Sequence, residues 1–154
     1  MMEKTPKHII AVSALITNDN NEVLLVKVQW RQDTWEMPGG QVEEGEALDE
    51  AAAREILEET GLVIEPVGIT GVYYNTTKHI LSVVFKGNYI SGDIQHPPEE
   101  ISDARFIEIN EANIERYITR PHMKSRTLDA INAENIIPYE TWEVSPYHLI
   151  GRLF

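Results

Sequence analysis

The stretch at residues 39–62, GGQVEEGEALDEAAAREILEETGL, decides how this chain is interpreted. It joins a glycine pair to an alanine-rich segment that carries three closely spaced glutamates. Glu55, Glu58 and Glu59 are three and four residues apart, so a helix places their carboxylates on one face. Like charges on one helix face repel each other, so helix stability alone does not explain the cluster. Magnesium, manganese and calcium prefer carboxylate oxygens, and the pattern therefore predicts a divalent-cation site.

The alanine-rich segment predicts a helix at about residues 47–60, ended by Gly61. The residues expected on its buried side are Leu48, Ala52, Ile56 and Leu57. Pro38, Gly39 and Gly40 cannot lie inside a regular helix or strand, so they predict a tight turn or a close approach of the backbone to a ligand. Arg54 either holds one of the carboxylates in place or forms an ordinary surface ion pair.

The rest of the chain predicts an α/β protein. Strands are expected at residues 9–16, 23–28, 63–74, 81–89 and 104–109, and weaker helices at 110–117 and 123–133. The first two strands flank Asn-Asp-Asn-Asn at 18–21, which indicates a hairpin rather than a signal peptide. Strands on both sides of the main helix predict a mixed sheet with helices packed against it.

Composition limits the function. The 154 residues suit one domain, and the formal net charge of -12 argues against a nucleic-acid backbone as the partner. A small phosphate-bearing ligand still fits if cations lie between it and the carboxylates. No cysteine is present, which excludes a thiol nucleophile, and no apolar run reaches the ~20 residues of a membrane span. A cytoplasmic location is expected.

Residues 40–62 resemble the Nudix box. Gly40, Glu46 and the run REILEETGL at 54–62 match every fixed position of that pattern. The resemblance implies a single Nudix hydrolase domain over residues 1–154, with a C-terminal extension from about 122 to 154. It further implies an α/β/α sandwich, in which a mixed sheet lies between helices.

The resemblance also implies site residues and a cofactor, Mg²⁺ or Mn²⁺. The metal ligands carried over by position are the Gly39 carbonyl, Glu55, Glu58 and Glu59, with Glu100 as the candidate from a later loop. The catalytic residues are Glu55, Glu58 and Arg54, where Glu55 is either a ligand or the base that activates water. Gly40, Glu46 and Gly61 have structural roles in the motif.

The implied activity is metal-dependent hydrolysis of a nucleoside diphosphate linked to another moiety. Absent signatures of other subfamilies favour a nucleoside triphosphate or a modified one, cleaved to the monophosphate and pyrophosphate. The alternatives are ADP-ribose, nucleotide sugars or dinucleoside polyphosphates, and, from another class, a nucleotide-sensing module without catalysis. Trp30, Arg31 and Tyr73 are candidate substrate contacts. Homodimerisation and the role of the aromatic C-terminal tail stay open.

Overall fold

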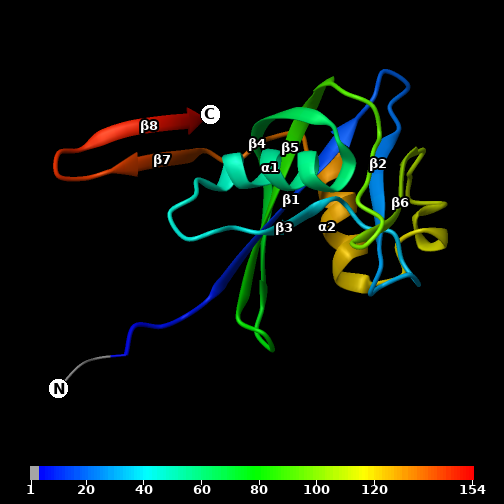
Figure 1. Cartoon of the computed structure of the whole chain (residues 1–154), viewed down its shortest axis with the longest axis horizontal. Helices are drawn as coiled ribbons and strands as arrows, with labels where there is room; N and C mark the ends of the chain where they lie inside the picture. Colours follow the sequence, from blue (N-terminus) through cyan, green and yellow to red (C-terminus); the bar gives the residue numbers. More distant parts are fainter. Residues whose placement is uncertain (1–3) are drawn as a thin grey trace.

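A mixed sheet with one helix on each face organises the chain in the computed structural model, which describes residues 4–154 (Figure 1). The elements are β1 (Ile9–Thr17), β2 (Val23–Val28), β3 (Gly39–Gln41), α1 (Leu48–Thr60), β4 (Val63–Asn75), β5 (Ile80–Ser91), β6 (Ile101–Ile107), the 3-10 helix η1 (Ile114–Arg116), α2 (Pro121–Asn132), β7 (Tyr139–Glu143) and β8 (His148–Leu153). The sheet order is β4-β5-β1-β2-β6, and β3 pairs with β1. The β1–β5 pair is parallel and the other pairs are antiparallel.

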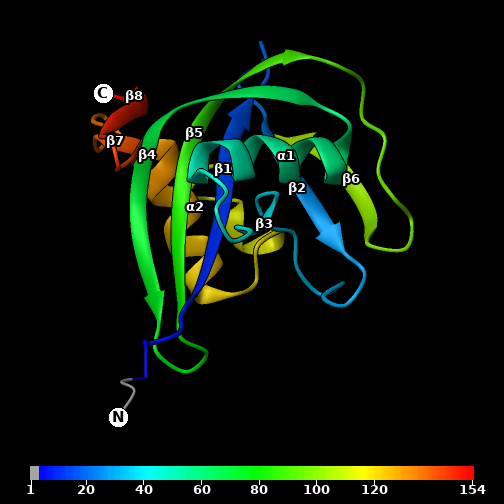
Figure 2. The same ribbon diagram turned by 60° about the vertical axis from the view of Figure 1, so that its left-hand side comes forward.

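The two helices cover opposite faces of the sheet, so the predicted sandwich is confirmed (Figure 2). Alternate residues of a strand point to opposite faces. On β1, Val12, Ala14 and Ile16 pack in the cluster that contains α1, whereas Leu15 packs in the cluster that contains Ile114 and α2. Both sides of the central strand are therefore buried.

The predicted buried side of α1 was wrong at one position. Ala52 and Ile56 are fully buried, but the side chain of Leu57 is 50% exposed. The buried stripe continues instead through Glu59 and Thr60. The reason is that the last turn of α1 faces the glycine pair, with which the Glu59 carboxylate forms a hydrogen bond.

The first hairpin was predicted correctly, but its strands separate soon after the turn. β1 and β2 pair directly at Thr17 and Val23, and residues 35–41 then lie between them. Gly39–Gln41 forms strand β3 on β1, so the expectation that the glycine pair could not be in a strand was wrong. Glycine is required there because a Cβ at Gly39 would lie 2.0 Å from the Val12 carbonyl oxygen.

Other differences concern the second half of the chain. The expected helix at 110–117 is only the short η1, and the expected strand at 104–109 is β6, which starts and ends earlier. α2 starts at Pro121, before the expected residue 123. The aromatic tail forms an antiparallel hairpin, β7–β8, which extends away from the rest of the molecule (Figure 1). Over residues 4–154, no helix has the length and apolar character to cross a membrane.

Candidate active site

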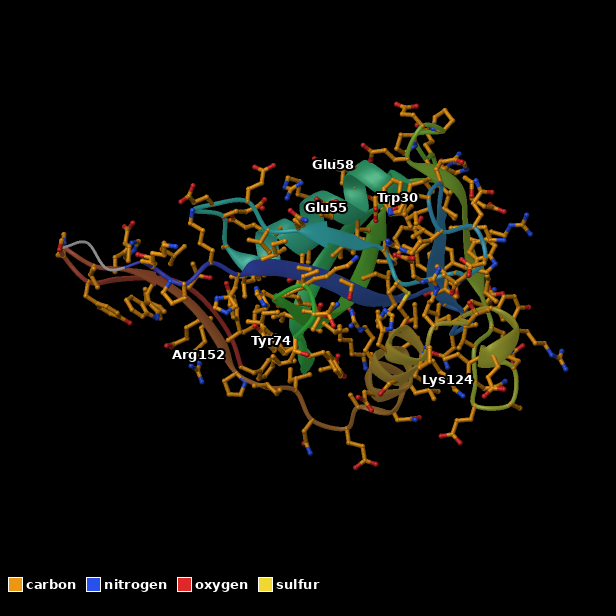
Figure 3. All side chains as sticks on the ribbon, turned by 90° about the horizontal axis from the view of Figure 1, so that it is seen from below. Trp30, Glu55, Glu58, Tyr74, Lys124 and Arg152 are labelled. Atoms are coloured by element: carbon orange, nitrogen blue, oxygen red, sulfur yellow. The ribbon has the colours of Figure 1, made fainter. Side chains whose placement is uncertain are left out.

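One guanidinium connects three of the acidic side chains that the sequence singled out. Arg54 donates to both carboxylate oxygens of Glu46, at 2.6 Å from Nε and 2.9 Å from Nη2. Its Nη1 lies 3.0 Å from Glu55 and 3.3 Å from Glu58. These contacts tie the loop before α1 to the acidic face of the helix, on which Figure 3 labels Glu55 and Glu58.

The bidentate contact with Arg54 keeps the Glu46 carboxylate ionised and in place. It lowers the pKa of Glu46 to about 2, with a further contribution from the Glu43 backbone N–H. The same contact is the main cause that raises the pKa of Arg54. Both groups stay charged at neutral pH, so this anchor holds through the physiological range.

Glu59 has the most perturbed environment of the cluster. Its side chain is only 8% exposed, and its Oε1 accepts the Gly39 N–H at 2.9 Å. Burial raises the pKa of Glu59 to about 8, against the opposing effect of that hydrogen bond. The charges of Glu55, Glu36 and Glu100 raise it further.

Glu55 lies directly against the glycine pair. A Cβ added at Gly40 would lie 2.4 Å from its carboxyl carbon, so only glycine lets the backbone come this close. Burial is the largest cause that raises the pKa of Glu55, and Arg54 opposes it. Two carboxylates of α1, on Glu55 and Glu59, therefore contact the two peptides of the glycine pair.

The remaining predicted side-chain ligands, Glu58 and Glu100, are more exposed to solvent than Glu55 and Glu59. The Glu58 side chain is 55% exposed and is held by Arg54. Glu100 is exposed in the turn before β6, and its charge raises the pKa of both Glu55 and Glu59, which places it towards the cluster. Among residues 4–154, no three acidic or histidine side chains converge into a ready-made cation site.

The chemistry of these groups nevertheless fits a divalent cation. Carboxylates whose ionisation is opposed by burial and by neighbouring negative charge gain most from a bound cation. Oxygen donors from Glu55, Glu58, Glu59 and the Gly39 peptide are of the kind that magnesium and manganese take.

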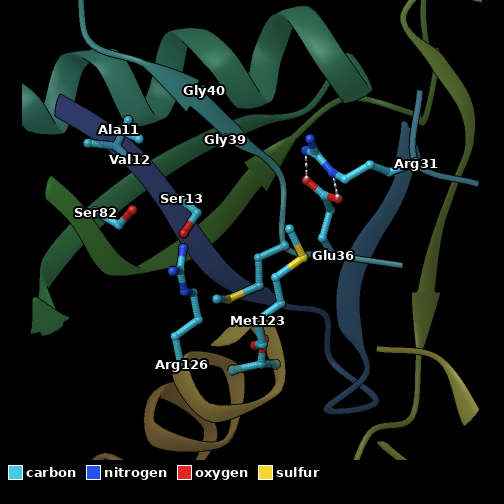
Figure 4. A pocket seen from close by; sticks show the side chains of 12 residues that line it. Ala11, Val12, Ser13, Arg31, Glu36, Gly39, Gly40, Ser82, Met123 and Arg126 are labelled. Atoms are coloured by element: carbon cyan, nitrogen blue, oxygen red, sulfur yellow. Dashed lines mark hydrogen bonds and ion pairs between the residues drawn. The ribbon is translucent and has the colours of Figure 1, made fainter. Parts of the chain in front are cut away.

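A cavity of about 170 Å³ opens on the other side of the glycine pair (Figure 4). Its lining includes Gly39 and Gly40, Ser13 and Ser82 from the sheet, and Met123 and Arg126 from α2. Sequence reasoning missed Met123 and Arg126, because α2 is distant from the box along the chain and nothing local marks its inner face.

Arg126 is the unusual member of this lining. Its guanidinium lies over the Tyr73 ring at 5.4 Å, and its Nε donates to the His122 carbonyl at 3.2 Å. Burial lowers its pKa. Within the described residues it forms no ion pair with a carboxylate, although buried charges usually have a partner.

The three predicted substrate contacts lie in different places. Arg31 lines the cavity, but its Nε and Nη2 donate to the Glu36 carboxylate, at 3.0 and 2.8 Å (Figure 4). Tyr73 lies behind Arg126, and its hydroxyl donates to Asp129 at 2.7 Å. Trp30 is 64% exposed and is not part of the cavity lining.

Comparisons with known proteins agree with this geometry. Residues 7–127 match the NUDIX domain family. A MutT-like protein of Streptomyces ambofaciens is 32% identical over 134 residues, which cover 78% of this chain and 84% of that protein. An ADP-ribose pyrophosphatase of Methanocaldococcus jannaschii is 35% identical over 107 residues, covering 66% of this chain and 62% of that protein.

Solved structures give the same result. The crystal structure of a MutT protein from Methanosarcina mazei Go1 has a TM-score of 0.65 and 31% sequence identity, covering 82% of this chain and 94% of that one. The match to the NUDIX domain family, over residues 7–127, runs from β1 into α2 and includes the acidic helix and the glycine pair. The chain therefore belongs to the Nudix hydrolase family.

Proposed function

We propose that this enzyme hydrolyses the phosphoanhydride of a nucleoside triphosphate, or of a modified one, to the monophosphate and pyrophosphate. Water attacks one of the two phosphorus atoms that the bridging oxygen joins, and this oxygen leaves with the other phosphoryl group. The observation that carries the proposal is the position of the glycine pair, which has the acidic helix on one side and a cavity of about 170 Å³ on the other.

The acidic side of the glycine pair is the proposed cation site. Glu55, Glu58, Glu59 and the Gly39 carbonyl would hold Mg²⁺ or Mn²⁺, with Glu100 as a further donor from its loop. The Nudix family generally uses divalent metals, which polarise phosphoryl oxygens and stabilise the leaving group. Without cations, an acidic face would repel an anionic anhydride.

The protein's own residues perform the other tasks. Arg54 positions Glu55 and Glu58 through its Nη1 contacts, and Glu46 holds Arg54 in that position. The Glu55 carboxylate lies against the glycine backbone. There it would either accept a proton from a water bound beside that backbone or serve as a metal ligand.

The cavity is the proposed site for the part of the substrate beyond the phosphates. It is smaller than the ~300 Å³ of pockets that enclose a whole ligand, so it suits one ring system or one small group. Arg126 would donate to acceptor atoms there, with Ser13 and Ser82 as neighbours. Tyr73 would support Arg126 from behind rather than contact the substrate.

A second candidate substrate is ADP-ribose, because a relative with that activity is 35% identical over 107 residues. The same cation site would serve, since ADP-ribose also contains a diphosphate. The products differ, because ADP-ribose yields AMP and ribose 5-phosphate without pyrophosphate.

The test is a substrate panel with magnesium and with manganese. It contains the nucleoside triphosphates, oxidised nucleoside triphosphates, ADP-ribose, nucleotide sugars and dinucleoside polyphosphates, and pyrophosphate and monophosphate are quantified separately. We expect pyrophosphate release from a triphosphate and no turnover in excess chelator. A folded protein that binds nucleotides but cleaves none of them would support the non-catalytic sensing module instead.

A further inference from the structure

The C-terminal hairpin, residues 139–153, has one face that is only half covered. Residues paired across strands share a face, so the register places Tyr139, Thr141, Trp142, Leu149, Gly151 and Leu153 on one side. A register shift between Thr141 and Trp142 lets both of these neighbours point to that side. We call this side the inner face; it carries no charged residue.

The half of the inner face nearest the sheet is covered by the protein's own core. The Tyr139 ring meets Phe85 edge-on at a centroid distance of 5.9 Å, and Leu153 packs against the α1 cluster. The Tyr139 hydroxyl also accepts the Leu48 N–H at 3.0 Å, which joins the hairpin to the first turn of α1.

Among residues 4–154, no part of the chain covers the far half of the inner face. Trp142 is 56% exposed, Leu149 is 40% exposed, and Tyr147, whose ring lies 6.4 Å from that of Trp142, is 64% exposed. The opposite face of the hairpin carries the charged residues and the exposed Ile150; Glu140 pairs there with Arg152, and the Glu143 carboxylate lies 3.4 Å from His148 Nδ1. The inner face is thus apolar along its length, but the core covers only its base.

Two-stranded hairpins are at best marginally stable in water by themselves. The outer part of β7–β8 lies beyond the body of the protein, as Figures 1 and 3 show. The inner face is buried at its base and continues into solvent at its far half. An exposed apolar surface of this kind is typical of a region that another molecule covers in an assembly.

We propose that the cover is the hairpin of a second copy of this chain, with the two inner faces packed around a two-fold axis. By this register the exposed large apolar side chains of the inner face are Trp142, Leu149 and, through its ring contact with Trp142, Tyr147. Together they leave on the order of 350 Å² of apolar surface per copy. With its backbone and polar atoms, the inner face reaches the size of a weak, reversible interface, which takes less than about 600 Å² from each partner.

Charge also favours the hairpin over other surfaces as the contact between copies. The chain has a net charge of -12, so two copies repel each other through most faces. Residues 135–154 contain only two acids and one base, a net of -1, and each acid already has a partner on the hairpin. A self-complementary patch of this kind gives a closed, two-fold dimer.

The experiment is sedimentation velocity on the whole chain from about 1 to about 100 μM, the range in which a modest interface dissociates. We expect a reversible dimer. Trp142→Glu should raise the dimer dissociation constant by at least about 30-fold, as for a central interface residue. Ile90→Glu is the matched control, because Ile90 is 55% exposed on the main sheet, and it should leave the constant unchanged.

A second measurement covers the case in which Trp142→Glu disturbs the hairpin itself. The chain has no cysteine, so Tyr147→Cys introduces a single thiol beside Trp142. Mild oxidation should join two copies covalently through this thiol, and not through Ile90→Cys. A chain that is monomeric at every concentration would overturn the proposal, and so would a dimer that Trp142→Glu leaves intact and Tyr147→Cys fails to crosslink.

Discussion

Replacing Glu59 by glutamine tests the electrostatics of the cluster through folding stability, measured without metal or substrate. The carboxylate is 8% exposed and accepts the Gly39 N–H, and the glutamine carbonyl oxygen can keep that hydrogen bond. What the substitution removes is an ionisable group in a poorly solvated place. We therefore expect the variant to be more stable than the wild type at neutral pH when both are free of metal.

The magnitude follows from the perturbed titration. Burial raises the pKa of Glu59 from 4.5 to about 8, so between these values the native state holds a proton that the unfolded chain releases. The free energy of unfolding must then fall as pH rises through this window. At ~1.4 kcal/mol per pH unit the loss is about 3 kcal/mol by pH 7, or roughly 6–12 °C in Tm for a chain of this size.

The assay is thermal and urea unfolding of both proteins in chelator, from pH 5 to pH 8. The stability difference between variant and wild type should be below about 1 kcal/mol at pH 5 and grow with pH. Magnesium should then stabilise the wild type more at pH 8 than at pH 6, because binding to the native state requires ionised carboxylates. Glu50→Gln, on the exposed side of α1, is the matched control.

Parallel stability curves for wild type and Glu59→Gln would refute this reasoning. They would mean that Glu59 ionises in the native protein as easily as in the unfolded chain, so that neither burial nor the neighbouring charges oppose it.

Four further outcomes concern activity. Glu58→Gln should reduce kcat/KM by about 100-fold or more while the free energy of unfolding shifts by less than about 0.5 kcal/mol, because Glu58 is exposed and its carboxylate is held by Arg54. Steady-state kinetics and urea unfolding check this, and unimpaired turnover would remove Glu58 from the cation site. Arg54→Lys should reduce kcat by about 10- to 100-fold, since lysine cannot make the two-pronged contact, and kcat equal to wild type would show that the contact is dispensable. Gly40→Ala should fold, by circular dichroism, yet lose activity, because its Cβ would displace the Glu55 carboxyl; full activity would show that this close approach is not required. Arg126→Met should lower kcat/KM by roughly 10- to 100-fold, the effect of a lost charged hydrogen bond, and leave the magnesium dependence as it was; an unchanged kcat/KM would exclude contact with the substrate.

Local patterns in the sequence were enough to predict the box helix. Its alanines favour a helix, and its end at Gly61 follows from a left-handed φ of 78°, which glycine adopts easily. The glutamate spacing likewise identified the acidic face before any partner was known. The error at Leu57 arose because the buried side of the last turn is set by the glycine pair, which is distant along the chain.

Features that depend on pairing between distant segments were not predictable in this way. Nothing local indicates that residues 35–41 insert between β1 and β2, because their partners are chosen by tertiary packing. The inner face of α2 and the position of Arg126 depend on how α2 packs on the sheet. The C-terminal hairpin was not predicted either, although Ser-Pro at 145–146 separates the two runs that form β7 and β8.

The glycine pair of β3 works as a partition two peptides wide. The acidic helix lies on one side of it, and the cavity lined by residues of the sheet and of α2 lies on the other. Under the proposed function, the cations belong to the first side and the choice of substrate to the second. Because the two glycines have no side chains, a substitution on one side of the pair has few contacts through which to disturb the other side. A designer could therefore exchange the α2 side to redirect the enzyme towards a new nucleotide and leave the hydrolytic half untouched.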